Sequence, residues 1–257
     1  MLMLRSRSSW VAALAFVGLA LGQADELVAA TYSINPTRIL LSAKSSSALL
    51  TLRNESDEPL RFQVTGFVWK QTAAGEMELK PTDDIVFFPA LFTLEPKQER
   101  RIRVGTTVSF GSIEKSYRIF VEELPPPKTK NAPGSVRVLT RMGVPVFLQP
   151  AVLASTAGIE AVGRVAAGYA FTVRNSGNVH FIPDRVRVRA LGGDGVVITD
   201  AELPSWYILA GSTRVYTFDP PRIGCERVRR FLVDVQVGQS VITERLETPA
   251  GACGPTR

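Results

Sequence analysis

The chain has very few of the residues from which most metal and catalytic sites are built. Its 257 residues include one histidine, His180, and two cysteines, Cys225 and Cys253. Two cysteines without a cluster of histidines do not make a zinc site of the usual kind, which takes four Cys or His ligands. The sequence also lacks a Gly-x-Ser-x-Gly motif, a phosphate-binding loop and paired His ligands. We therefore expect no catalytic residues, no metal and no cofactor, and we expect His180 to be a surface or turn residue.

The positive charge is not concentrated anywhere. The formal net charge is +6, but the Lys and Arg residues are spread along the chain without a basic run that contains interleaved aromatics. Nucleic-acid binding is therefore not expected, and no motif indicates a small-molecule substrate. With 45% hydrophobic and 21% charged residues, the composition is that of an ordinary globular protein of one large or two small domains.

Long apolar runs are absent except near the N-terminus. Arg5 and Arg7 precede an apolar run from Trp10 to Leu21. This pattern predicts a secretory signal peptide over residues 1–30, cut after Ala30 or alternatively after Ala24. The alternative is a membrane anchor, for which the run is short, since a span needs about 20 residues. We expect an exported protein.

In an exported protein, Cys225 and Cys253 are most simply one disulfide, and two free buried thiols are the alternative.

Segments with the period of a helix are missing as well. Short alternating segments recur instead, with turns every 8 to 12 residues, which predicts an all-β chain of sandwich domains. A weak internal repeat relates residues 50–64, LTLRNESDEPLRFQV, to residues 171–186, FTVRNSGNVHFIPDRV. We therefore predict two β-sandwich domains, residues 31–149 and 150–257, joined by a short fixed elbow.

One segment stands out by its length. In residues 135–149, SVRVLTRMGVPVFLQ, apolar side chains recur at every second position, and Thr140 is the exception among them. This period of two predicts a single long strand with one apolar face. Either the whole face belongs to the core, or the strand is an edge whose apolar ladder is kept for another chain. Exposed edges of that kind are normally avoided because they template aggregation, so keeping one indicates a use.

Several segments together resemble a known family. They are INPTRILLSAK (34–44), RNESDEPLRFQV (53–64), FTLEPKQERRIRV (92–104), YRIFVEELPP (117–126) and VRVLTRMGVPVFLQP (136–150). In order and spacing they are similar to the N-terminal domain of PapD-like periplasmic chaperones, which assemble pili (fimbriae) by the chaperone–usher pathway. YRIFVEELPP is the most specific segment, and the short loop that follows it resembles the short-loop or archaic branch. The resemblance covers about 120 residues of the first domain and little of the second.

This resemblance implies a fold, a function and partners. It implies two immunoglobulin-like sandwiches set at an angle, like a boomerang. It also implies a non-enzymatic chaperone that binds and caps pilus subunits and delivers them to an outer-membrane usher. The chaperone lends the last strand of its first domain to a subunit that lacks one. The side chains entering the subunit would be Val136, Val138, Thr140 and Met142.

The resemblance also implies a basic pair that holds the subunit's C-terminal carboxylate. The arginine of that pair matches Arg38. The lysine is missing, because Pro145 stands at its position. Arg141 or Arg118 are the residues that could replace it.

Two other functions fit a β-sandwich chain. A structural pilin or adhesin should carry an alternating donor segment at its mature N-terminus, where this chain has Pro36 and Arg38. A secreted glycan-binding protein should have clustered exposed aromatics, whereas Trp69 and Trp206 are far apart in the sequence. We further expect the free chaperone to self-associate into a homodimer through its unoccupied strand.

Overall fold

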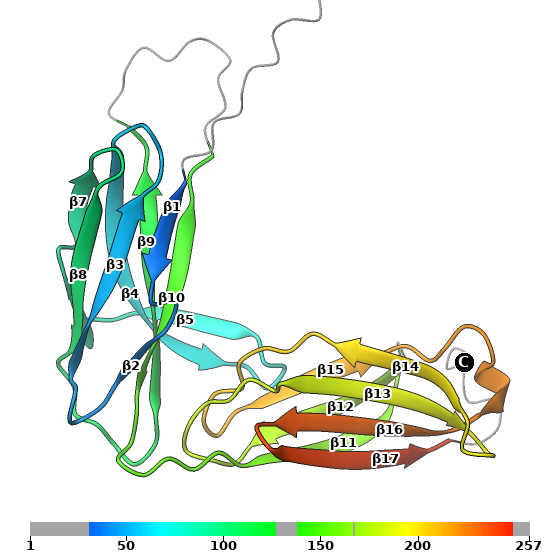
Figure 1. Cartoon of the computed structure of the whole chain (residues 1–257). Coiled ribbons are helices and arrows are strands. Elements are labelled where there is room, and N and C mark those ends of the chain that lie inside the picture. Colours follow the sequence, from blue (N-terminus) through cyan, green and yellow to red (C-terminus); the bar gives the residue numbers. More distant parts are fainter. Residues whose placement is uncertain (1–30, 127–137, 167, 249–257) are drawn as a thin grey trace, which may run out of the picture.

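The computed structural model describes residues 31–126, 138–166 and 168–248. These residues form two β-sandwiches that meet at an angle, as Figure 1 shows. This confirms the predicted all-β fold of two sandwiches. The predicted signal peptide, Val136 and Cys253 lie outside the described residues. In the part of the chain that is described, no helix is long and apolar enough to cross a membrane.

The first sandwich packs two sheets against each other. One has the order β1–β3–β8–β6, made of Tyr32–Asn35, Ser47–Asn54, Glu99–Thr106 and Ile85–Phe88. The other has the order β2–β10–β9–β4–β5, made of Ile39–Leu41, Arg141–Leu148, Lys115–Leu124, Leu60–Gln71 and Met77–Pro81. A further strand, β7 (Leu91–Leu94), also pairs with β4.

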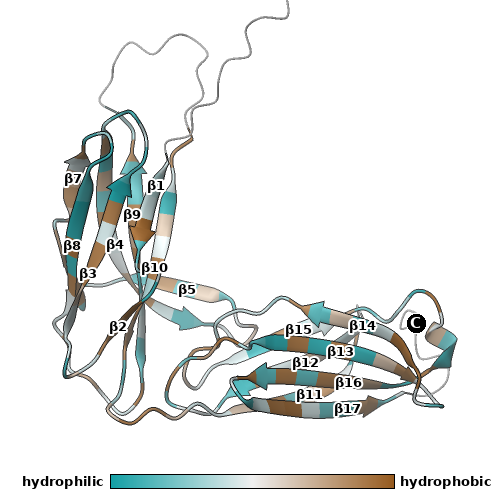
Figure 2. Ribbon diagram, in the orientation of Figure 1, coloured by the Kyte–Doolittle hydropathy of each residue, from teal (hydrophilic) through white to brown (hydrophobic). Residues whose placement is uncertain are grey.

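Alternation along these strands builds the core between the two sheets. In β8, Ile102 and Val104 are fully buried, while Arg101 and Arg103 point to solvent. In β9, Tyr117, Ile119 and Val121 face the same core. Figure 2 shows hydrophobic and hydrophilic bands following one another along the strands. Side chains in a strand alternate between faces, so the period of two seen in the sequence becomes one buried face and one exposed face.

The second sandwich has a three-stranded and a four-stranded sheet. The first has the order β11–β12–β15, made of Ala157–Val165, Gly168–Asn175 and Thr213–Phe218. The second has the order β14–β13–β16–β17, made of Val197–Leu203, Arg185–Gly192, Val228–Val237 and Ser240–Glu247. A short 3₁₀ turn, Cys225–Arg227, precedes β16. The core between these sheets contains Phe171, Phe231 and Val233.

The internal repeat has a structural explanation in two buried asparagines. The Asn54 amide donates to the carbonyl oxygens of Glu58 and Leu94, and its Oδ1 accepts from the Ser56 N–H. The Asn175 amide makes the same kind of bonds to Val179 and Ile208. Both side chains are fully buried. Each asparagine satisfies backbone groups of the turn that follows its strand, which explains why Arg-Asn and a polar turn occur once in each domain.

The long predicted strand over residues 135–149 is shorter in the structure. In the described part, β10 begins at Arg141, and Val138 to Thr140 precede it outside any strand. Its antiparallel partner β9 ends at Leu124, immediately before Pro125 and Pro126. Proline has no backbone N–H to donate, so the ladder between the two strands cannot continue past this point.

Candidate functional site

Strand β10 has a partner along one side and an open edge along part of the other. It pairs with β9 from Arg141 to Leu148. On its other side it pairs in parallel with β2, but only from Val146 to Leu148. Within the described residues, no strand covers that side between Arg141 and Pro145. The backbone groups of this stretch are therefore available to a strand from another chain.

Burial divides the same segment into two halves. Val144, Val146 and Leu148 are at most 3% exposed and belong to the core of the first sandwich. Val138 is 52% exposed and Met142 is 36% exposed. Each of the two interpretations of the alternating segment therefore describes one part of it. The second half is core, and the first half carries apolar side chains that this chain itself does not bury.

Tyr32 holds the exposed half of the segment against the first sandwich at one residue, Thr140. Its hydroxyl lies 3.3 Å from the carbonyl oxygens of both Val121 and Thr140, to which it can donate. The Glu123 N–H also donates to the Thr140 carbonyl, at 2.9 Å. Burial, and after it the nearby charge of Glu123, raises the pKa of Tyr32 to about 12. Thr140 thus fastens the exposed half of the segment, in which it lies between Val138 and Met142, to the first sandwich.

The predicted anchor positions lie in one row across the outer face of the sheet. Ile39 pairs with Val146 in the parallel ladder, so Arg38, one residue earlier, stands at the level of Pro145. Pro145 in turn pairs with Arg118 on β9. Residues opposite one another in a sheet share a face, and the missing lysine position therefore lies between Arg38 and Arg118. The structure brings these two arginines to the same level of the sheet.

Arg118 is a buried cation with no acidic partner among the residues that the structure describes. Its side chain is 9% exposed, and its guanidinium carbon lies 4.8 Å from the ring centroid of Trp69 and 5.8 Å from that of Trp206. Its Nη1 donates to the sulfur of Met77 at 3.1 Å. Burial lowers the pKa of Arg118 below its usual value. A buried charge is normally paired because desolvation is costly, so an unpaired one marks a candidate site for an anion.

The other candidate, Arg141, already has partners. Its Nε lies 3.4 Å from Oε2 of Glu122, and its guanidinium stacks 3.9 Å from the ring centroid of Phe120. The neighbouring Gly143 makes room for this ring, because a Cβ there would be 2.9 Å from Phe120. Two arginines were considered as replacements for the lysine. Of these, Arg118 has no ion-pair partner among the described residues, and it lies opposite Pro145, where the lysine is missing. Arg38 is exposed and makes no ion pair among the described residues.

The second sandwich contributes to this region through its segment before β15. The Gln71 side chain donates to the Tyr207 carbonyl at 2.7 Å and accepts from the Leu209 N–H at 2.8 Å. These two bonds fix the segment that carries Trp206 against the end of β4. Trp69 and Trp206, which are far apart in the sequence, therefore lie close together in the structure. They come together at Arg118, although only Trp206 is substantially exposed.

His180 is part of the contact between the two domains. Its ring stacks on Phe147 with centroids 3.6 Å apart, and its Nδ1 lies 2.6 Å from Oε1 of Glu114. The imidazole is 8% exposed, so the expectation of a surface or turn residue is wrong for its side chain. Sequence alone gave no signal for this pairing, because Glu114 and His180 belong to different domains.

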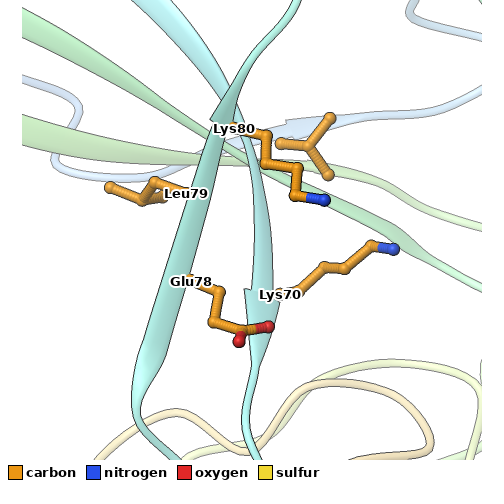
Figure 3. A pocket seen from close by; sticks show the side chains of 5 residues that line it. Lys70, Glu78, Leu79 and Lys80 are labelled. Atoms are coloured by element: carbon orange, nitrogen blue, oxygen red, sulfur yellow. The ribbon is translucent and has the colours of Figure 1, made fainter.

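One hollow near the site lies on the β4–β5 hairpin. It has a volume of about 450 Å³ and is lined by Val68, Lys70, Glu78, Leu79 and Lys80 (Figure 3). Figure 3 shows the Lys70 and Lys80 side chains extending to the same side of the hairpin. Neither the open edge of β10 nor Arg118 lines this hollow. Among the described residues, no group of His, Cys, Asp and Glu side chains could hold a metal ion.

Cys225 is disulfide-bonded. The chain contains only one other cysteine, Cys253, which lies outside the described residues. The pairing of Cys225 with Cys253 therefore stays a prediction.

Comparison with family models identifies the class of the first domain. Residues 31–154 match the model described as "Pili and flagellar-assembly chaperone, PapD N-terminal domain". This match confirms the resemblance drawn from the sequence motifs of the first domain. Comparison with curated protein sequences finds no match.

Solved structures share the fold of both domains. A chain of the CsuC–CsuE complex, a chaperone with a tip adhesion subunit from the archaic Csu pili of Acinetobacter baumannii, aligns with a TM-score of 0.58 and 18% identity, over 83% of this chain and 98% of that one. The E. coli chaperone DraB aligns with a TM-score of 0.53 and 18% identity, over 87% and 98%. A chain of the Salmonella enterica SafA pilin–SafB chaperone complex gives 0.52 and 16%, over 85% and 98%. The chain thus has the two-domain fold of pilus chaperones.

Proposed function

We propose that this protein is a periplasmic chaperone that binds and caps pilus subunits by lending them the open edge of β10. The observation that supports this most directly is the division of that strand. Its second half is anchored in the core, whereas Arg141 to Pro145 have one edge that no described strand covers, and Val138 and Met142 present exposed apolar side chains. The structures of similar fold include chaperones in complex with a pilin and with an adhesion subunit.

In the proposed complex, a subunit strand pairs with the open side of β10. Main-chain hydrogen bonds set the register, and alternate side chains enter the subunit's exposed core. Val138 and Met142 would each contribute roughly 1.5 to 3 kcal/mol on full burial. Thr140, already half-buried and fastened to the first sandwich, would make the weakest contact. Val136 would extend the ladder by one pocket.

We further propose that the subunit's C-terminal carboxylate is held by Arg38 and Arg118. Arg38 is exposed immediately before β2, and Arg118 lies at the same level with no acidic partner in the described part of the chain. Arg141 is the weaker candidate because it is paired with Glu122. A carboxylate bound at this level would fix where the subunit strand begins along β10, and therefore which side chain enters which pocket.

The proposal includes export, delivery to an outer-membrane usher, and self-association of the free chaperone. Export follows from the predicted signal peptide, and delivery follows from the family of the first domain. Self-association follows from the same exposed edge. No described residue cluster indicates catalysis, so the free energy for assembly would come from folding of the subunit itself. The archaic branch remains a prediction from the short loop.

A periplasmic pull-down tests the proposed function. The chain, tagged at its C-terminus, is expressed beside its neighbouring genes and compared with a Val138→Glu/Met142→Glu variant. Val241→Glu is the matched control, because Val241 is also an exposed apolar residue, on an edge strand of the second domain. We expect a small β-rich subunit to co-purify with the wild type and the control and to be lost from the double variant.

Retention of the same partner by the double variant would contradict strand lending. It would favour a structural pilin or a glycan-binding protein instead. If binding is lost as expected, Arg38→Ala and Arg118→Gln should each weaken capture, because each removes a charged hydrogen-bond donor from the carboxylate.

A further inference from the structure

Two buried N–H groups, one on Trp69 and one on Arg118, have no acceptor within the described residues. Nε1 of Trp69 and Nε of Arg118 are both inaccessible to solvent and have no hydrogen-bond partner among the described residues. The two side chains touch, since the guanidinium carbon is 4.8 Å from the Trp69 ring centroid. Buried donors are almost always paired, so these two side chains in contact each lack an acceptor that such a group normally has.

The one acceptor that Arg118 has in this region is weak. Met77 offers a thioether sulfur to Nη1, and thioethers are weak acceptors. Met77 lies at the start of the β4–β5 hairpin's second strand and is 43% exposed. It is a flexible side chain that a stronger acceptor could displace. Trp206, at 41% exposure, forms the other accessible wall.

We infer that Trp69 and Trp206 belong to the carboxylate site, Trp69 as a hydrogen-bond donor through its indole N–H and Trp206 as an aromatic wall supplied by the second domain. The ligand is a chain-terminal carboxylate, which accepts from Arg118 and Trp69 after Met77 moves aside. This inference rests on the proposed function and deepens it. It makes the site incomplete in the first domain alone.

The chemistry of the surrounding groups favours a carboxylate over other acceptors. Arginine presents a planar fork that matches a carboxylate, and aromatic faces stack on that plane without using its N–H groups. Here two indole rings lie near the guanidinium, while only one of its N–H groups has a partner in the described residues. A neutral carbonyl would leave the buried positive charge uncompensated, whereas a carboxylate neutralises it.

Gln71 positions the segment that carries Trp206, the aromatic wall of the proposed site. It touches neither Arg118 nor the proposed ligand, but its two bonds to Tyr207 and Leu209 hold both sides of the short segment that follows Trp206. Trp206 also packs edge-on against Tyr207 with centroids 5.5 Å apart. Loss of the Gln71 amide should therefore move the wall while leaving the charge of Arg118 in place.

The tryptophans make the site directly observable. The chain has three, and Trp10 lies within the predicted signal peptide. In the full chain carrying Trp10→Phe, every tryptophan is therefore in contact with Arg118. The probe is an acetylated hexapeptide of alternating Val and Thr with a free C-terminal carboxylate, compared with the same peptide as a C-terminal amide. We expect the acid to change the emission and to bind about tenfold or more tightly than the amide.

Single substitutions assign the contributions. Arg118→Gln should abolish the preference for the acid. Trp69→Phe keeps an aromatic ring at this position but removes the indole N–H. It should lower the preference for the acid over the amide several-fold, while the emission of Trp206 still reports binding. Gln71→Ala should weaken both peptides and reduce the emission change of Trp206 without removing the preference. The matched control is Arg187→Gln, which removes an arginine from the outer face of the second domain and should change nothing.

The outcomes separate this inference from the proposed function. Equal affinity for acid and amide, or no emission change with either, overturns the inference, and so does a Trp69→Phe variant with the full preference for the acid. The proposed function survives these results if the subunit still co-purifies with the wild-type chain. Failure of the pull-down with an intact acid preference would instead leave a carboxylate site that serves some other ligand. Thermal unfolding of each variant shows whether it is folded.

Discussion

The two halves of the segment from Val138 to Leu148 have the same alternating apolar pattern but differ in burial. Val144, Val146 and Leu148 are core residues, paired with β9 and, from Val146 onward, with β2 as well. Val138 and Met142 continue the same apolar pattern but lie at an open edge. The difference is not in the side chains but in what covers them. Apolar alternation predicts a face that will be buried, and the tertiary structure decides whether this chain or another one buries it.

A substitution in the buried half should have the largest effect on stability. Leu148→Ala removes a fully buried side chain and leaves a cavity, so we expect the free energy of unfolding to fall by about 2 to 5 kcal/mol. Urea denaturation of the purified chain measures this change. A loss below about 1 kcal/mol would show that this half is not a tightly packed core.

A substitution at Tyr32, which contacts the exposed half at Thr140, should have a smaller effect on the free energy of unfolding, and this effect should depend on pH. Tyr32→Phe removes the hydroxyl between Val121 and Thr140, which should cost about 1 kcal/mol near neutral pH.

The sign of the pH dependence follows from the raised pKa of Tyr32. A pKa of about 12 in the folded chain, against 10.0 ordinarily, means that folding favours the neutral phenol. The stability it provides is complete below pH 10 and is lost as the pH rises through about 12. Tyr32→Phe should therefore flatten the alkaline decline in stability, measured by urea denaturation between pH 9 and 12. The decline should not vanish, because burial and Asp84 also raise the pKa of Tyr117. An unchanged slope would contradict this role for Tyr32.

A substitution in the exposed half should have the smallest effect on the free chain. Met142→Ser exchanges a partly exposed apolar side chain, so we expect a change of about 0.5 kcal/mol or less in unfolding free energy. The same variant should weaken subunit capture in the pull-down. It should also lower self-association, which analytical ultracentrifugation at high protein concentration measures. Destabilisation as large as that of Leu148→Ala would show that the two halves do not differ.

Much of the fold could be predicted from local sequence patterns. Short alternating segments predicted an all-β chain, and the structure has strands throughout both domains. Alternation failed where pairing rather than pattern sets the strand end. In the second copy of the internal repeat, Phe181 makes a single isolated bridge to Ile208, and the next strand, β13, begins only at Arg185. The strand expected from Ser135 starts at Arg141 within the described residues, because its partner ends before two prolines.

Residue types and short spacings were enough to predict the class of the chain and the alternation along its strands. They were also enough to match Arg38 to the anchor arginine and Pro145 to the position of the missing lysine. The sequence by itself could not place Arg118 between Trp69 and Trp206, or His180 against Glu114, because those contacts join strands and domains that are far apart along the chain. Nor could it divide the apolar ladder into a buried and an open half. That division depends on where β2 stops pairing with β10, which only the packed structure decides.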